Sequence, residues 1–269
     1  MNRRPWALGA VVALVFLFLY APIAWLAIAS FNSSRSLSRI SGFSLQWYAE
    51  LLDDTRVFAS LQLTLQLALA SAAISTVIGT LAAFGLRRAF PGRGLWTVLL
   101  SLPLVVPEVV MGVAMLGFFV RLAGIPLGFG ALLFAHVAFS LSFVVVVVRS
   151  RVSGMDARME EAAADLGASP FVAFRTVTLP LVAPAVVAGA AFAFLLSFDD
   201  VVISSYLTGV GSTTLPVFVY AQASKRGISP EIVALSTLMV TATALLLIIG
   251  VLIASWRARK SGSAAKLAV

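Results

Sequence analysis

The sequence predicts an all-α integral membrane protein with six transmembrane helices and both termini in the cytoplasm. Of its 269 residues, 61% are hydrophobic and 11% are charged, whereas a soluble domain has about 45–50% apolar and about 25% charged residues. The apolar residues form long uncharged stretches and not the short alternating segments of a transmembrane β-barrel. This composition excludes a soluble enzyme, a nucleic-acid-binding module and a disordered segment.

The six spans follow from the positions of the charges, because a helix that crosses the hydrocarbon layer needs about 20 apolar residues. Four stretches contain no charged residue, another contains only Glu108, and another contains only Asp199 and Asp200. Trimmed at polar or Pro/Gly ends, they predict spans at 6–29, 61–86, 95–120, 130–149, 183–207 and 232–255. The run Val144–Val148 resembles a strand by propensity, but we interpret it as lipid-facing helix.

The first span could instead be a cleaved signal peptide, because Arg3 and Arg4 precede it. Its apolar run is longer than the 7–15 residues of a signal peptide, so we expect a retained helix. With the N-terminus inside, thirteen of the 19 basic residues lie on the inner side, as the positive-inside rule requires. We predict an N-terminal helix with its outer loop (1–60), a transmembrane core (61–255) with an inner loop (150–182), and a basic cytoplasmic tail (256–269).

The residue inventory argues against metal and enzymatic sites. There is no cysteine, which excludes a disulfide scaffold and a Cys-ligated metal. The single histidine, His136, argues against a His-rich metal site. We find no glycine-rich loop followed by Lys-Ser/Thr and no set of nucleophile, base and orienting residue. We therefore expect no cofactor, no metal and no enzymatic activity, and we attribute the net charge of +8 to membrane orientation and not to nucleic acid.

The inner loop predicts two short helices joined by a tight turn. Residues 156–166 are helix-compatible, and Gly167 is a typical C-terminal stop. Ser169 and Pro170 are suited to the N-cap and the first position of a second helix, which we expect to end at Leu179-Pro180. This hairpin could lie on the membrane surface, or it could act as a lever that passes motion between the spans and a soluble partner.

The spacing in this loop resembles the EAA loop of bacterial ABC importer permeases, EAA-x3-G-x9-I-x-L-P. Glu161-Ala162-Ala163, Gly167 and Val177-Thr178-Leu179-Pro180 match it, with Val177 in place of isoleucine. In that family the loop forms a coupling helix that sits in a cleft of the ATPase subunit. The resemblance implies the type-1 permease fold and ATPase coupling through Glu161, Ala162, Ala163, Asp165, Gly167, Ser169, Pro170, Leu179 and Pro180.

Three further segments are similar to spermidine/putrescine importer permeases, and the resemblance covers essentially residues 5–256. The segments are 103–108, 197–204, and 229–231 with 234–237. The resemblance implies a multi-pass permease subunit of the bacterial inner membrane that forms half of a path for a cationic solute, a polyamine. It also implies a second permease subunit, two ATPase subunits that hydrolyse the ATP, and an extracytoplasmic solute-binding protein.

Three acidic residues lie within the predicted spans with no basic residue beside them: Glu108, Asp199 and Asp200. An ionised group at mid-bilayer costs about 2.5–3.5 kcal/mol on insertion scales and faces a cavity or a partner. The three could be protonated and hydrogen-bonded, could pair with a second subunit, or could line a path for a cation together with Ser197. Because adjacent helical residues are about 100° apart, we expect one aspartate to line the path and the other to bond locally.

Three smaller features concern packing. Pro103 and Pro107 predict either a kink in the third span that serves packing or a broken helix that faces a cavity or protein. Small residues recur every four positions on two spans and predict close helix packing; they are Ser71, Ser75, Gly79 and Ala83, and Ala185, Gly189, Ala193 and Ser197. We interpret His136 as a hydrogen-bonded packing residue.

Other functions remain open from the sequence. The chain could be an ABC importer permease for another solute, such as iron, sulfate or an opine. It could also be a secondary transporter with Glu108, Asp199 and Asp200 as a proton relay, although such transporters are often built from internal repeats, which we do not find. A purely structural membrane protein would give the three acids no role.

Overall fold

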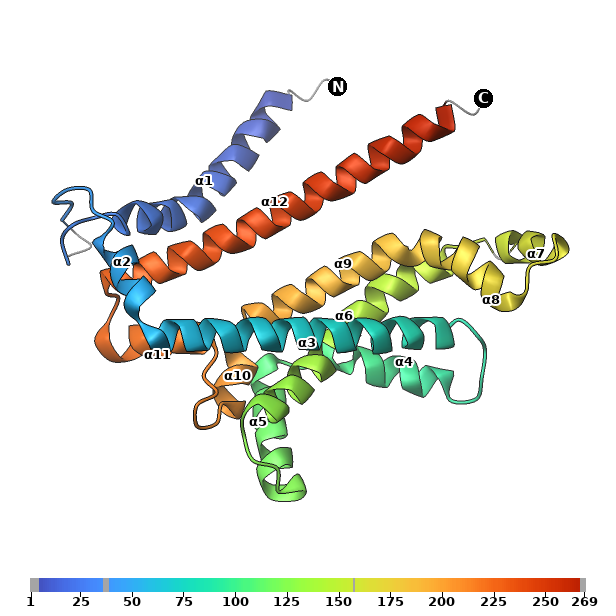
Figure 1. Cartoon of the computed structure of the whole chain (residues 1–269), viewed down its shortest axis with the longest axis horizontal. Coiled ribbons are helices and arrows are strands. Elements are labelled where there is room, and N and C mark those ends of the chain that lie inside the picture. The colour runs from blue at the N-terminus through green and yellow to red at the C-terminus, as the bar shows by residue number, and fades with distance from the viewer. Residues whose placement is uncertain (1–4, 36–38, 157, 267–269) are drawn as a thin grey trace. The chain divides into compact units, whose positions relative to one another are not determined.

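The computed structural model describes residues 5–35, 39–156 and 158–266, and the regular elements within these ranges are all helical (Figure 1). The predicted all-α class is therefore confirmed. The chain forms two compact units, residues 1–55 with 221–269 and residues 56–220, which we describe separately. The predicted division into 1–60, 61–255 and 256–269 stays a prediction.

The first unit contains α1 (Pro5–Ala29), α2 (Gln46–Asp53) and α12 (Pro230–Lys266). α12 packs against both α1 and α2, and it continues as a helix well past residue 255, where the last span was expected to end. The helix α11 (Leu215–Arg226) leads from the second unit into the first.

The second unit is built on three long helices, α3 (Thr55–Gly85), α6 (Phe129–Ser153) and α9 (Leu179–Phe198), with α6 packed along α9. Shorter elements complete it: α4 (Arg93–Ser101), η1 (Leu102–Leu104), α5 (Glu108–Gly117), η2 (Phe118–Ala123), α7 (Arg158–Asp165), α8 (Pro170–Ala173), η3 (Phe174–Thr178) and α10 (Val202–Leu207). Of these, η1 is a 3₁₀-helix, whereas η2 and η3 are π-helices.

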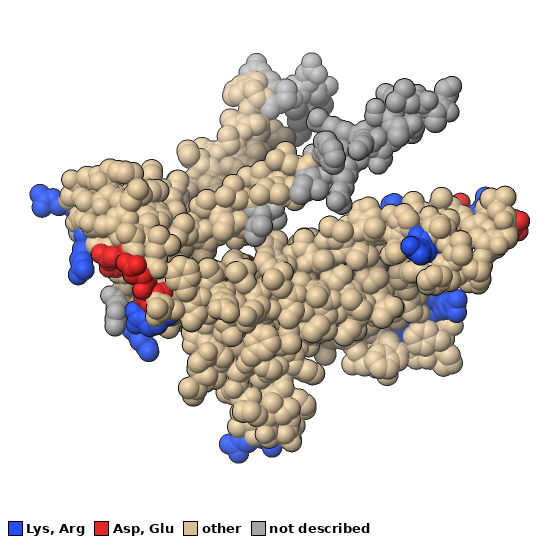
Figure 2. All heavy atoms as spheres, in the orientation of Figure 1, with Lys and Arg blue, Asp and Glu red and all other residues tan. Residues whose placement is uncertain are grey.

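Within the described ranges, five helices are long and apolar enough to cross a membrane: Leu8–Ala29, Thr55–Gly85, Phe129–Ser153, Pro170–Phe198 and Pro230–Gly250. A sixth crossing is formed if Arg93–Leu104 and Glu108–Ala123, which meet at an angle of 106°, count as one bent span. On the face in Figure 2, the charged side chains of the second unit gather at its ends and leave a wide uncharged band between them. The predicted multi-pass membrane architecture is thus confirmed.

The small residues allow the long helices to approach closely. The four small residues of α3 are all buried, and a Cβ atom at Gly79 would lie only 2.7 Å from Cγ1 of Val144 on α6. On α9, Gly189 receives the same valine, with an added Cβ 3.4 Å away. Val144 is therefore fully buried between α3 and α9.

Our interpretation of Val144–Val148 as lipid-facing helix was correct in its helix but wrong in direction for three of its valines. Val144, Val145 and Val148 are 0%, 3% and 0% exposed, whereas Val146 is 46% exposed. The small residues of the two neighbouring helices leave room for branched side chains at Val144, which packs against protein.

Candidate functional site

The predicted third span, 95–120, is broken at its centre and is not a kinked single helix. The first arm ends at Leu104, and the second begins at Glu108 after Pro107, which has φ −57° and ψ 136°. Proline has no N–H to donate and disfavours helical conformation in the preceding residue, so the helix cannot continue through Pro107. The break places the Glu108 carboxylate in the first turn of α5, where it is exposed.

The predicted fifth span, 183–207, is also broken, because α9 ends at Phe198 and α10 begins at Val202. The two aspartates therefore do not share a helix, and the helical geometry from which we expected a separation of about 100° does not apply to them. Asp200 turns back onto α10, where Oδ2 accepts a hydrogen bond from the Ser204 backbone N–H at 2.7 Å and Oδ1 accepts one from Ile203 at 3.3 Å. Asp199 is the C-cap residue of α9 and is exposed.

The two breaks lie beside each other, because α5 packs against α10. Gly112 on α5 receives the ring of Tyr206 on α10 so closely that an added Cβ would overlap the ring. Glu108 lies within electrostatic range of both Asp199 and Asp200. The fold thus brings together the three acids that the sequence singled out, and we call Glu108, Asp199 and Asp200 the carboxylate cluster.

His136 on α6 lies behind this cluster and is bonded on both ring nitrogens. Its Nδ1 is 2.7 Å from Ser197 Oγ and its Nε2 is 3.0 Å from Ser204 Oγ, which agrees with a hydrogen-bonded packing residue. Nε2 is also 3.5 Å from Asp200 Oδ2. The expectation that all three acids lack a basic neighbour was therefore wrong for Asp200.

The other two acids differ from Asp200. Within the described part of the chain, Glu108 and Asp199 form no ion pair, and both are exposed. Ser197, which the sequence placed with them, is only 3% exposed and bonds His136 instead. The structure thus separates two exposed carboxylates from a buried group made of Asp200, His136 and two serines.

The inner loop forms the expected pair of helices joined by a tight turn. Gly167 ends α7 with φ +85°, and the N–H groups of Gly167 and Ala168 donate to the carbonyl oxygens of Ala164 and Ala163 at 2.8 and 3.0 Å. These two bonds form a Schellman motif. Ser169 caps the second helix, since its Oγ accepts from the Val172 N–H at 3.4 Å. We call residues 158–178 the hairpin.

The second helix of the hairpin does not end at Leu179-Pro180, as the sequence led us to expect. α8 passes through the π-helical turn η3 into α9, so that Pro170–Phe198 is one continuous helix. Pro180 lies in the first turn of α9, immediately after the π-helical turn η3. In a π-helical turn the hydrogen bonds join residues five positions apart and replace the usual bonds between residues four positions apart. The hairpin is therefore joined directly to a membrane helix.

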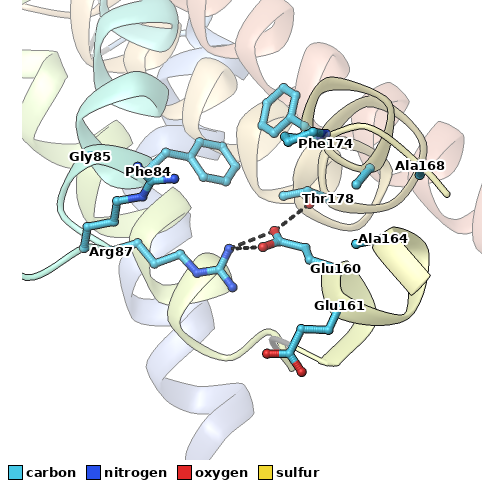
Figure 3. Close-up of a pocket in the computed structure, with 12 residues that line it drawn as sticks. Phe84, Gly85, Arg87, Glu160, Glu161, Ala164, Ala168, Phe174 and Thr178 are labelled. Atoms are coloured by element: carbon cyan, nitrogen blue, oxygen red, sulfur yellow. Dashed lines mark hydrogen bonds and ion pairs between the residues drawn. The ribbon is translucent and has the colours of Figure 1, made fainter. Parts of the chain in front are cut away.

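A carboxylate that the sequence analysis missed fastens the hairpin to α3 (Figure 3). Arg87, just after α3, donates from Nη1 to Oε1 and Oε2 of Glu160 at 2.8 and 3.0 Å, and Thr178 Oγ1 donates to Oε1 at 2.7 Å. The Thr178 hydrogen bond and then Arg87 hold the pKa of Glu160 below its ordinary value. No pattern in the sequence links Glu160 to Arg87, because the two are 73 positions apart.

The same junction borders an open cavity of about 650 Å³. Phe84 and Phe174 meet edge to face at 5.4 Å on its wall. Eight of the nine predicted coupling residues are exposed, and Ala163 is half-buried; the eight are Glu161, Ala162, Asp165, Gly167, Ser169, Pro170, Leu179 and Pro180. Leu166 and Phe171 are 90% and 71% exposed. The hairpin therefore offers an apolar and polar surface that the described part of this chain leaves uncovered.

Apolar helices broken at acidic residues, with a polar hairpin on a membrane helix, define a polytopic membrane protein. Solved transporters have the same fold. A chain of a bacterial ABC transporter that imports the acidic polysaccharide alginate aligns with a TM-score of 0.69 at 16% identity, covering 94% of this chain and 97% of that one. A chain of the inward-facing MetNI methionine ABC transporter aligns with a TM-score of 0.62 at 20% identity, covering 73% and 94%.

Sequence comparison assigns the family. Residues 75–261 match the binding-protein-dependent transport system inner membrane component family. The putrescine transport system permease protein PotI of Escherichia coli K12 is 42% identical over 247 residues, covering 89% of this chain and 87% of that protein. The spermidine/putrescine transport system permease protein PotC of Shigella flexneri is 41% identical over 259 residues, covering 96% and 97%. The chain belongs to this family of inner membrane transport components.

Proposed function

We propose that this chain is the permease subunit of an ATP-driven polyamine importer and forms half of the path for spermidine or putrescine. The observation that carries the proposal is the pair of exposed carboxylates, Glu108 and Asp199, at two adjacent helix breaks. Backbone that is not helical is tolerated at membrane depth where it lines a cavity or is buried in protein. The names and identities of the PotI and PotC relatives support the choice of solute.

The chemistry of a polyamine fits such a site. A polyamine carries two or more ammonium groups on a flexible methylene chain, so it needs separated negative charges with apolar surface between them. Glu108 supplies one charge from the start of α5, and Asp199 supplies the other from the break between α9 and α10. Apolar residues of α5, such as Val109, are exposed beside them. A neutral or anionic solute would gain nothing from these carboxylates.

The hairpin supplies the connection to ATP hydrolysis in this proposal. Two ATPase subunits, a second permease subunit and an extracytoplasmic binding protein complete the transporter, and both termini of this chain are cytoplasmic. ATP-driven closure of the ATPases would push the hairpin. Because the hairpin continues without interruption into α9, its motion would reach the helix break at Asp199 and open the path outward.

The test is uptake by the complete transporter reconstituted in lipid vesicles with ATP inside and its binding protein outside. We expect uptake of radiolabelled putrescine or spermidine, with no competition from sulfate. Uptake of sulfate or iron instead of a polyamine would contradict the solute assignment. Transport by this chain alone, driven by a pH gradient, would contradict the ATP-driven mechanism.

A further inference from the structure

We propose that His136 is a positioning residue that fixes the break between α9 and α10, so that Asp199, and not Asp200, faces the cation path. The inference rests on the proposed function, because it concerns which carboxylate meets the solute. His136 lies on α6, whereas Ser197 closes α9 and Ser204 lies in α10. One imidazole therefore joins both sides of residues 199–201 to a third helix.

The imidazole is held tightly on both sides of the break. Nδ1 is 2.7 Å from Ser197 Oγ, and Nε2 is 3.0 Å from Ser204 Oγ. The three residues are 2%, 3% and 0% exposed, so water does not compete for these bonds. A buried polar group that loses its partner costs free energy, and this cost keeps the two arms at a fixed separation.

The position of Asp200 selects the orientation of the hydrogen bonds. A neutral imidazole has one donor nitrogen and one acceptor nitrogen. Asp200 Oδ2, which accepts from the Ser204 N–H, lies 3.5 Å from Nε2, so a lone pair on Nε2 would face an acceptor oxygen. Nε2 therefore carries the proton and faces Asp200, and Nδ1 of the neutral ring accepts from the Ser197 hydroxyl. A protonated imidazole would keep the same Nε2–H toward Asp200.

This arrangement occupies Asp200 and leaves its neighbour available. The Asp200 oxygens accept two backbone N–H groups of α10 and face the imidazole, and its side chain is 6% exposed. Asp199 is exposed and forms no ion pair among the described residues. Asp199 and Asp200 thus have different roles, and the hydrogen bonds of His136 determine which of the two faces the path.

The test compares two substitutions that place an amide at different ring positions. In His136→Gln the amide nitrogen reaches the Nε2 position and can still donate toward Asp200 and Ser204. In His136→Asn it reaches only the Nδ1 position. In the reconstituted complete transporter, we expect His136→Gln to keep the putrescine KM within about twofold and His136→Asn to raise it about tenfold, with a smaller change in kcat.

A second measurement does not depend on transport. The chain contains no cysteine, so Asp199→Cys in a cysteine-free transporter introduces a single thiol. Its rate of modification by a cationic methanethiosulfonate reagent reports whether position 199 is open to the path. We expect His136→Gln to retain this rate and His136→Asn to lower it about tenfold. Size-exclusion chromatography shows whether each complex is assembled.

The outcomes separate the two proposals. If the unaltered transporter takes up no polyamine, the proposed function fails, yet the thiol modification still tests the role of His136. If His136→Gln and His136→Asn behave alike in both measurements, the positioning role is wrong. If the His136→Asn complex does not assemble, Ser204→Ala takes its place, and an unchanged modification rate in that variant would likewise overturn the proposal.

Discussion

Arg87 and Glu160 form an ion pair in which one arginine nitrogen, Nη1, lies 2.8 and 3.0 Å from the two carboxylate oxygens. The pair joins the end of α3 to the first helix of the hairpin, and Thr178 extends it to the second. A surface that moves as a lever must be connected to the helices that it moves. This junction supplies the connection to α3, while the continuous helix Pro170–Phe198 supplies the connection to α9.

We expect Arg87→Ala to weaken coupling more than stability. Ion pairs that are partly exposed contribute about 1 kcal/mol or less, and these two side chains are 28% and 34% exposed. The measurement is substrate-stimulated ATP hydrolysis by the complete transporter, which should fall several-fold in Arg87→Ala. Arg88→Ala is the control, because Arg88 lines the same cavity and acts on Glu160 through its charge alone. An equal loss in both variants would contradict a specific role for the pair.

The same carboxylate predicts how stability depends on pH. The pKa of Glu160 is lowered in the folded chain from its ordinary value of 4.5 by the Thr178 hydrogen bond and by Arg87. Its stabilisation is therefore complete above pH 4.5 and is lost as the pH falls through the lower folded pKa. The difference in Tm between the unaltered chain and Glu160→Gln should be constant from pH 7 to about 5 and should narrow below 4.5. A difference that widens on acidification would contradict the assignment.

The turn of the hairpin predicts a graded effect of substitutions at Gly167. Its φ of +85° costs an L-residue about 1–2 kcal/mol, and asparagine tolerates such a conformation better than alanine. Binding of the ATPase subunits to the permease should therefore be weakened least by Gly167→Asn, more by Gly167→Ala and most by Gly167→Pro. Pull-down of the ATPase by the tagged permease measures this order. If Gly167→Pro left assembly and uptake unchanged, the hairpin would not be the lever.

Close packing between α3 and α6 predicts the effect of a single methyl group. A Cβ at Gly79 would lie 2.7 Å from Val144 Cγ1, whereas a Cβ at Gly85 on the same helix meets nothing within 4 Å. Overpacking costs about 1–3 kcal/mol, so Gly79→Ala should lower the Tm and Gly85→Ala should not. Equal Tm values for the two single variants would contradict this contact.

The features that were predictable from the sequence are those that a short stretch determines. Uncharged runs locate the apolar helices, and Gly167 with Ser169 locates the hairpin turn because each acts on its own backbone. The break in the fifth span was not predictable in the same way. The segment before Asp199 is apolar, and the helix ends where Asp200 accepts from the N–H groups of α10. His136, which is far away in the sequence, bonds Ser197 and Ser204 on the two sides of this break.

The exposed carboxylates give the last prediction. Glu108→Gln and Asp199→Asn each remove one charge from the proposed path without changing side-chain volume, so each should raise the putrescine KM in vesicle uptake about tenfold. Hydrolysis of ATP without solute should remain unchanged, since neither residue lies in the hairpin. An amino alcohol, in which a hydroxyl replaces one ammonium of putrescine, should have a higher KM than putrescine in the unaltered transporter. This difference in KM should disappear in one of the two variants, namely the one that lacks the carboxylate that binds the replaced ammonium. Unaltered polyamine transport in both variants would contradict a carboxylate-lined path and would leave the polyamine to be recognised by another part of the transporter.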